Sequence, residues 1–289
     1  MYTSNERQLF DSHESGNPIA MARGEVHLWC AHYGEMRDER LLAYYWTLLS
    51  GDERKQQQRF HFEKDRLRYL VTRALVRLTL SRYAPVEPCE WNFVANAYGR
   101  PEARYPAARS PRLKFNLSHT DHLIVLAVTA GRAVGVDVEN IRVRDAPIGI
   151  ADRYFAADEV AALKRVSHVE QQRRFFEYWT FKEAYIKARG MGLSLPLDKF
   201  SFHLAEERSV SVRIDPELND HATRWQLWQF APAPEYLAAL CVERHGLLPA
   251  TVVLREVMPG VRERVLRADF TRVSRVLMSS ELHAEETAC

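Results

Sequence analysis

The sequence has 289 residues, which leaves room for one large domain or two smaller ones. Hydrophobic residues make up 46% of the chain and charged residues 27%, as in folded globular proteins, which excludes a disordered or collagen-like chain. The 40 basic and 38 acidic residues leave a net charge of +2, too small for wholesale binding to nucleic acid or to an anionic membrane, so any anion site must be local.

The longest strongly apolar stretch, Leu123 to Ala130, is about half the length that a membrane-spanning helix requires. The N-terminus also lacks the apolar core of a secretory signal. We therefore expect a cytoplasmic protein that makes no membrane contact.

The first part of the chain is polar at its start and then becomes periodic. Its apolar spacing and its prolines predict, in order, a flexible extension at 1–24, a strand at 26–29, a helix at 40–49, one helix or two joined helices at 52–82, and loops with sparse regular structure at 84–111.

The second part mixes strands and helices. Strands are predicted at 113–116, 123–129 and 134–139, helices at 147–166 and 169–189, and further strands at 200–204, 209–214, 225–230, 236–242 and 251–257. The short linker 130–133 predicts a hairpin between 123–129 and 134–139, and Gly190 is expected to end the long helix. An amphipathic helix is expected at Val261 to Leu277. Because strands and helices do not strictly alternate, the pattern favours an α+β fold.

One candidate site lies in the strand Val134 to Glu139. Alternation places Gly135, Asp137 and Glu139 on one face and the valines on the other. The two carboxylates, with Cα atoms roughly 6.6 Å apart, suit a hard cation such as Mg²⁺. The alternative is an ordinary amphipathic strand with a polar face toward solvent.

A second candidate lies on the helix that contains Trp179 to Lys187. Glu183 and Lys187 are four residues apart and project from one side. They would form a surface ion pair of about 0.2 to 0.5 kcal/mol if the helix were exposed. Aromatic residues nearly all round it indicate burial instead, and buried charges need a partner or a function.

A third group consists of phosphate-seeking side chains. Ser118 and His119 follow a strand, and Arg100 lies in the turn Tyr98-Gly99-Arg100-Pro101. Each of these side chains alone is weak evidence for a phosphate site, because a histidine near a strand end, for example, often has only a structural role. Together with the two carboxylates and the Glu/Lys helix they indicate phosphoryl transfer, in which catalysis is mostly positioning and charge neutralisation. The sequence has no Walker loop and no glycine-rich dinucleotide fingerprint.

Taken in order, these motifs resemble the 4'-phosphopantetheinyl transferase superfamily, in particular its larger Sfp-type members. The family pattern G-[VI]-D-[VI]-E matches Gly135 to Glu139, and W-x-x-K-E-[AS]-x-x-K follows some forty residues later at Trp179 to Lys187. Gly190 to Leu197 continues the similarity, which covers about residues 25 to 257.

The resemblance implies a pseudo-twofold pair of α/β subdomains, each with an antiparallel sheet and a long helix, with the active site in the cleft between them. We accordingly divide the chain into an extension at 1–24, an N-terminal half at 25–130, a C-terminal half with the metal site at 131–257, and a C-terminal extension at 258–289. Since both halves lie in one chain, we expect a monomer.

The resemblance also implies a reaction. The 4'-phosphopantetheine arm of coenzyme A would move to a serine of an apo acyl or peptidyl carrier protein, with release of adenosine 3',5'-bisphosphate. Asp137, Glu139 and Glu183 would hold Mg²⁺. Glu183 would act as or orient the general base, and Lys187 would neutralise or protonate the leaving phosphate.

The nucleotide contacts implied by the resemblance are Arg68, Arg100, Ser118 and His119, with Lys182 as an additional phosphate contact. One departure concerns lysines that family members often carry before the Arg-x-Phe segment for the nucleotide phosphate. The matching positions here are Glu53 and Gln56, with Arg54 and Lys55 adjacent.

Two other functions remain open from the residues alone. One is a Mg²⁺-dependent phosphohydrolase or nucleotidyl transferase, and the other is a carrier-protein binding module that has lost catalysis. Carrier proteins of this class are acidic, so we expect docking on a basic and aromatic segment close to the metal strand. Its residues are Arg142, Arg144, Arg153, Tyr154 and Phe155.

Overall fold

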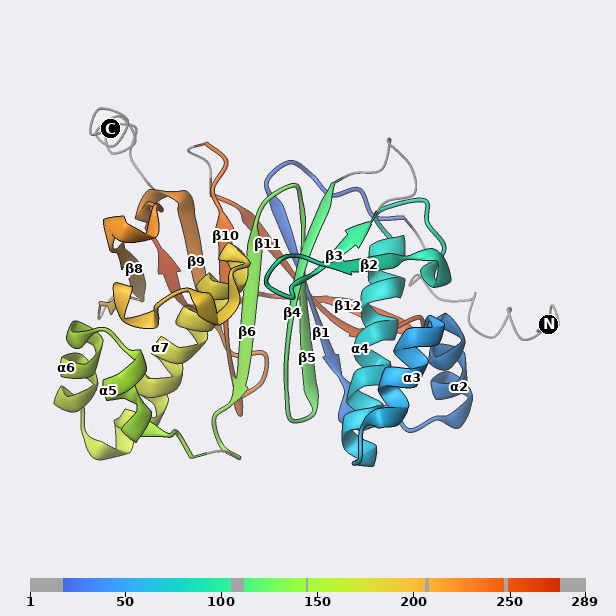
Figure 1. Cartoon of the computed structure of the whole chain (residues 1–289), viewed down its shortest axis with the longest axis horizontal. Coiled ribbons are helices and arrows are strands. Elements are labelled where there is room, and N and C mark those ends of the chain that lie inside the picture. The colour runs from blue at the N-terminus through green and yellow to red at the C-terminus, as the bar shows by residue number, and fades with distance from the viewer. Residues whose placement is uncertain (1–17, 105–111, 144, 206–207, 247–248, 276–289) are drawn as a thin grey trace.

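The computed structural model describes residues 18–104, 112–143, 145–205, 208–246 and 249–275 (Figure 1). Two β-sheets pack face to face, and a long helix covers the outer face of each, so that the layers run helix, sheet, sheet, helix. The mixed α+β architecture predicted from the sequence is confirmed. No helix in these ranges is long and apolar enough to cross a membrane.

The N-terminal half is built on a five-stranded sheet in the order β12-β11-β1-β5-β4. Its strands are β1 (Glu25–His32), β4 (Leu113–Thr120), β5 (Leu123–Ala130), β11 (Thr251–Met258) and β12 (Arg262–Leu266). Three helices belong to this half: α2 (Glu39–Leu48), α3 (Gly51–Arg59) and α4 (Glu63–Ser81). Apolar residues of α4 such as Val71 and Leu75 pack against Trp29 and Leu126 of the sheet to form the outer core.

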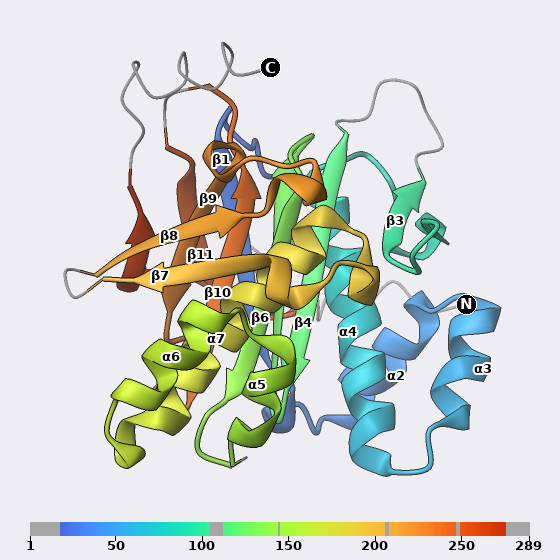
Figure 2. The same ribbon diagram turned by 60° about the vertical axis from the view of Figure 1, so that its left-hand side comes forward.

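The C-terminal half is built on a six-stranded sheet in the order β6-β10-β9-β13-β8-β7. Its strands are β6 (Val134–Asn140), β7 (Phe200–Leu204), β8 (Ser209–Ile214), β9 (Trp225–Phe230), β10 (Tyr236–Glu243) and β13 (Phe270–Ser274). Its helices are α5 (Ala151–Tyr154), α6 (Ala157–Arg165) and α7 (His168–Arg189). Figure 2 shows α7 running along this sheet, with α5 and α6 beside it. Gly190 ends α7 in the left-handed conformation, at φ 68°, as predicted.

The two sheets share a central core. The valines of β6 predicted to share one face, Val134, Val136 and Val138, pack there with residues of β1 and β5. The opposite face of β6, which carries Gly135, Asp137 and Glu139, is thereby turned toward α7. The prediction that the valines share one face of the strand and that Gly135, Asp137 and Glu139 share the other is confirmed.

The predicted hairpin between 123–129 and 134–139 is wrong. β5 pairs with β1 and β4, whereas β6 pairs with β10 in the other sheet. Gly131, at φ 78°, turns the chain between the sheets. Both segments are apolar on the face that enters the central core, so they stack across it instead of sharing a ladder.

The segment 52–82 forms two helices, α3 and α4, which is the second of the two predicted alternatives. Two local predictions change. The segment 147–166 breaks into α5 and α6 at the extended residue Phe155. A small hairpin, β2 (Asn92–Ala95) with β3 (Pro101–Arg104), lies where loops were expected. Its tip is the predicted Tyr98-Gly99-Arg100-Pro101 turn.

The amphipathic helix predicted at Val261 to Leu277 is wrong as far as residue 275, because this part contains β12 and β13; residues 276 and 277 lie outside the described residues. Strand β12 pairs with β11 at one edge, and β13 lies between β9 and β8. Each sheet is antiparallel except for one parallel pair, β1 with β11 and β13 with β8. Free strand edges in both sheets offered hydrogen bonds that the sequence pattern of this segment did not reveal.

The predicted domain boundaries do not coincide with the sheets. β11 was placed with the C-terminal half but pairs with β1 of the N-terminal half. Part of the predicted N-terminal extension is also anchored, because the Ile19 amide donates to the Arg82 carbonyl oxygen and Met21 packs on the outer core. Residues 1–17 lie outside the described residues.

Candidate active site

The candidate site lies at the seam where β4 of one sheet meets β6 of the other. Three alternate residues of β4, Asn116, Ser118 and Thr120, turn polar side chains toward β6. The Asn116 and Thr120 side chains accept hydrogen bonds from backbone amides of β6 at 2.9 and 3.1 Å. These side chains join the two halves, and Ser118 is placed between them.

The helix α7 reaches this seam because β6 carries a glycine there. A Cβ atom at Gly135 would lie 2.0 Å from the Ala184 carbonyl oxygen and 2.4 Å from the Ala188 amide nitrogen. Only glycine permits this backbone approach. The close approach brings the last turns of α7, with Glu183 and Lys187, beside Asp137.

Three predicted site residues form one hydrogen-bonded cluster. The Lys187 Nζ atom lies 2.7 Å from Asp137 Oδ1 and 2.9 Å from Ser118 Oγ. The Ser118 hydroxyl also donates to Asp137 Oδ1 at 2.9 Å. The other oxygen, Asp137 Oδ2, is buried and has no hydrogen-bond partner among the described residues. A buried carboxylate oxygen without a partner is costly, so a cation or donor supplied by a ligand would be stabilised here.

Glu183 lies one helical turn before Lys187. Burial and the negative charge of Asp137 raise the pKa of its carboxyl group, while Lys187 opposes the shift. A carboxylate with a raised pKa accepts a proton more readily at neutral pH, which suits a general base.

A groove of about 300 Å³ lies alongside the cluster and is lined by residues of α4 and β4. Arg68 and His119, both predicted to contact a nucleotide, line it. Burial, then the charge of Arg68 and also that of Lys187, lower the pKa of His119. Two arginines and one aspartate, Asp65, line the groove, so the formal charge of its lining is positive. Leu117 and His119, the two neighbours of Ser118 along β4, also line it, so the groove lies next to the cluster.

A further groove residue, Arg73, was not selected from the sequence. The only signal there was a locally basic helix, which does not tell a groove-facing arginine from a solvated one. Similarly, no sequence signal indicated that Asn116 and Thr120 join the halves.

Arg100 does not face this groove. Its guanidinium donates to the carbonyl oxygens of Lys187 and Ala188 on α7, at 2.9 and 3.3 Å. It also donates to those of Phe115 and Val134, at 3.2 and 3.3 Å. The predicted phosphate contact is not supported by this arrangement; Arg100 instead fastens the end of α7 to β4 and β6.

Lys182 was predicted as a phosphate contact, and this prediction is wrong. Its side chain is fully buried, with Nζ 2.7 Å from Glu159 Oε2. It also donates to the carbonyl oxygens of Leu197 and Phe200 at 2.7 and 2.8 Å. One residue before Glu183 on a helix, it points into the core of the C-terminal half and away from the seam.

The predicted metal ligands are only partly brought together. Asp137 and Glu183 interact, and Glu139 lies on the same face of β6. Within the described ranges, no three His, Cys, Asp or Glu side chains are grouped as metal ligands would be. The three-carboxylate site stays a prediction.

The predicted docking residues are only partly on the surface. Phe155 is buried and stacks on Phe175, with ring centroids 5.1 Å apart, so it is not available to a partner. The guanidinium of Arg153 lies over the Tyr154 ring at 5.3 Å. Arg142 is exposed, and Arg144 lies outside the described residues.

Two family models match successive parts of the chain. A model of the 4'-phosphopantetheinyl transferase superfamily matches residues 133–241, and a model of the 4'-phosphopantetheinyl transferase N-terminal region matches residues 37–131. The two matches meet where the chain crosses between the sheets.

Three similar curated proteins cover most of the chain. The 4'-phosphopantetheinyl transferase ffp of Bacillus subtilis is 33% identical over 206 residues, 71% of this chain and 85% of that protein. HetI of a Nostoc species, also named a 4'-phosphopantetheinyl transferase, is 32% identical over 80% of this chain and 93% of its own length. Sfp of Bacillus subtilis is 30% identical over 71% and 84%.

Proposed function

Because the chain belongs to the 4'-phosphopantetheinyl transferase superfamily, among its Sfp-type enzymes, we propose that it transfers the 4'-phosphopantetheine arm of coenzyme A to a serine of an apo acyl or peptidyl carrier protein. Adenosine 3',5'-bisphosphate is the second product. The expectations of a cytoplasmic, monomeric protein stay predictions.

The observation that carries this proposal is the cluster of Asp137, Ser118 and Lys187, with Glu183 one turn away. It combines a cation, a carboxylate with an unsatisfied oxygen and a carboxyl group of raised pKa. These are the groups needed to hold a diphosphate, accept a proton and stabilise a leaving phosphate. The electropositive groove beside them suits the nucleotide.

In the proposed reaction the carrier serine gives its proton to Glu183 or to a base that Glu183 orients. The serine oxygen then attacks the phosphorus that bears the pantetheine arm. The bond between this phosphorus and the bridging oxygen of the diphosphate breaks, and adenosine 3',5'-bisphosphate leaves with the electron pair. Lys187 neutralises or protonates that phosphate.

The chemistry of the seam suits a divalent cation, because Asp137 Oδ2 is buried without a partner among the described residues, Glu183 interacts with Asp137, and Glu139 follows on the same face of β6. These three would hold Mg²⁺, whose positive charge, when bound, would offset that of the diphosphate. Asp137 would then exchange part of its contact with Lys187 for the metal. Ser118, His119 and Arg68 would contact the nucleotide.

The test is a mass measurement on a purified apo carrier protein incubated with the enzyme, coenzyme A and Mg²⁺. We expect the carrier to gain one phosphopantetheine group, and chelation of the metal to stop the gain. Glu183→Gln and Asp137→Ala should abolish transfer. The control Glu217→Gln removes a carboxylate that is 72% exposed and should retain transfer.

The same assay separates the other functions. A phosphohydrolase or nucleotidyl transferase would consume coenzyme A or a nucleotide and leave the carrier mass unchanged. A binding module would bind the carrier without modifying it. Transfer at the normal rate by Glu183→Gln would contradict the proposed base.

A further inference from the structure

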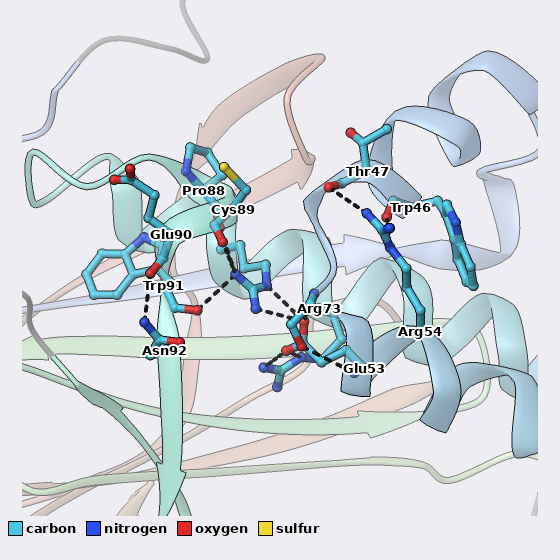
Figure 3. A network of polar contacts seen from close by, with 12 residues as sticks. Trp46, Thr47, Glu53, Arg54, Arg73, Pro88, Cys89, Glu90, Trp91 and Asn92 are labelled. Atoms are coloured by element: carbon cyan, nitrogen blue, oxygen red, sulfur yellow. Dashed lines mark hydrogen bonds and ion pairs between the residues drawn. The ribbon is translucent and has the colours of Figure 1, made fainter. Parts of the chain in front are cut away.

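The basic side chains of α3 turn away from the groove. Arg54 donates to the carbonyl oxygens of Trp46 and Thr47 at 3.2 and 3.1 Å, and Lys55 pairs with Asp52 on the surface. Figure 3 shows Arg54 directed to α2 and Glu53 directed to α4. In the described part of the chain, no basic side chain of α3 lines the groove.

Glu53 faces inward and meets two arginines of α4 (Figure 3). Its Oε1 atom accepts from Arg73 Nε at 2.6 Å and from Arg73 Nη2, and its Oε2 atom accepts from Arg77 Nη2 at 2.7 Å. Burial opposes ionisation of Glu53, but Arg73, the Ser50 amide and Arg77 outweigh it and lower the pKa of the carboxyl group. One carboxylate and two guanidinium groups leave one positive charge in excess.

The two arginines differ in whether a guanidinium nitrogen remains free to bind a ligand. Arg77 is almost fully buried, and its Nη1 atom donates to the carbonyl oxygens of Pro88 and Trp91 at 2.9 and 3.0 Å. Arg73 lines the groove, and its Nη1 atom has no hydrogen-bond partner among the described residues. The excess charge is therefore presented to the groove by Arg73.

Arg73 is also held in place. Its guanidinium lies over the Phe93 ring at 4.6 Å, and two of its nitrogens are fixed by Glu53. A planar guanidinium fixed in this way loses little freedom when it binds an oxyanion. The other arginine of the groove, Arg68, is already paired with Asp65 at 2.9 Å.

We propose that Arg73 binds the 3'-phosphate of coenzyme A and that Glu53 is the positioning residue that holds its guanidinium toward the groove. The inference rests on the proposed function, which places the diphosphate at Lys187. Leu117 and His119 of β4 line the groove together with the α4 arginines and flank Ser118 of the cluster, so the groove extends from the side of the cluster to Arg73. The remaining phosphate, a monoester with a charge of about −1.5 to −2, then reaches Arg73. The basic side chains of α3 do not line the groove, so Arg73 of α4 would supply the positive charge that binds the phosphate.

The experiment compares dissociation constants for coenzyme A and 3'-dephospho-coenzyme A by calorimetry. We expect the unmodified protein to prefer coenzyme A. Arg73→Gln should weaken coenzyme A binding by about 10-fold to 100-fold, the range for a charge-assisted hydrogen bond. Binding of the dephospho ligand should be unchanged, so that the preference falls accordingly.

Arg54→Gln is the matched control, since it removes a guanidinium of the same region that does not line the groove. It should leave both dissociation constants unchanged. Thermal unfolding checks that Arg73→Gln is folded, which we expect because Glu53 retains Arg77. Arg73→Lys keeps the positive charge but lacks the planar guanidinium, so it should lose part of the preference for coenzyme A. If Arg73→Gln does not fold, Arg73→Lys is used for the test.

An unchanged preference for coenzyme A in Arg73→Gln, or in Arg73→Lys where that variant carries the test, overturns the inference. The proposed function fails differently, because the unmodified protein would then bind neither ligand or leave the carrier unmodified. If the unmodified protein modifies the carrier but Arg73→Gln keeps the full preference for coenzyme A, only the role of Arg73 is refuted and the proposed function stands.

Discussion

Two faces of α7 carry a lysine paired with a carboxylate at the same distance, yet only one belongs to the candidate site. Lys182 and Glu159 are 2.7 Å apart with both side chains fully buried. Lys187 and Asp137 are also 2.7 Å apart, but Lys187 is 25% exposed. Distance alone therefore does not tell a structural ion pair from a functional one.

The difference lies in what surrounds each pair. Lys182 also donates hydrogen bonds to two backbone carbonyl oxygens, and Glu159 accepts hydrogen bonds from the amides of Ala156 and Phe202. The Lys187 pair lies beside Ser118, whose neighbours Leu117 and His119 line the groove, and Asp137 Oδ2 has no partner among the described residues. A buried pair whose polar atoms all have partners is costly to break, whereas a buried oxygen without a partner is open to a cation or donor from a ligand.

The largest effect should come from breaking the buried pair. Lys182→Met leaves Glu159 without its partner and should lower the free energy of unfolding by about 3 to 5 kcal/mol, measured by urea denaturation. Lys182→Met combined with Glu159→Leu should recover much of this loss, because no unpaired charge is then buried. A folded, stable Lys182→Met that had lost only coenzyme A binding would instead restore its predicted ligand role.

Breaking the other pair should affect turnover. Asp137→Asn should reduce carrier modification by about 10² to 10³-fold, the scale for loss of an oriented electrostatic group. Its unfolding free energy should change much less than that of Lys182→Met, since Lys187 is partly solvated. Asp152→Asn is the control, because Asp152 forms an exposed pair with Lys164 at the same 2.7 Å. If Asp137→Asn and Lys182→Met lost the same unfolding free energy, the distinction between a structural and a functional ion pair on α7 would be wrong.

The contrast also depends on the approach of α7 to β6. Gly135→Ala places a methyl group against backbone atoms of Ala184 and Ala188, which cannot rotate away. We expect a loss of about 1 to 3 kcal/mol in unfolding free energy, together with reduced carrier modification as the Lys187 end of α7 shifts. Gly149→Ala, where no atom lies within 4 Å, is the control. Normal turnover in Gly135→Ala would mean that the cluster does not need this approach.

The smallest effect concerns pH and the α3–α4 network. The pKa of Glu53 is below its ordinary value of 4.5 in the folded protein. Its contribution to stability is therefore complete above about pH 4.5 and lost as the pH falls through the lower folded pKa. Melting temperatures measured from pH 7 to pH 3 should fall less steeply at the acid end for Glu53→Gln than for the unmodified protein. Parallel curves would show that the ion pairs with Arg73 and Arg77 do not contribute.

Much of the site was predictable because its spacing is local. Strand alternation put Asp137 on the face opposite the valines, and helix spacing put Glu183 beside Lys187. The same rules could not separate Lys182 from Lys187, since both are lysines of one helix. Nor could they show that Arg100 donates to backbone carbonyls from elements far apart in the chain.

For the fold, too, some features follow from local sequence and others depend on tertiary contacts. The sequence by itself determined the α+β class, most strands and both long helices, because hydrophobic periodicity is set by neighbouring residues. Only the tertiary structure decided that β5 and β6 belong to different sheets, that the last described segment forms β12 and β13, and that Glu53 pairs with an arginine of the groove, Arg73. Strand pairing, burial and ion-pair partners depend on residues distant in the chain, and no local pattern encodes which of several compatible partners will be nearest.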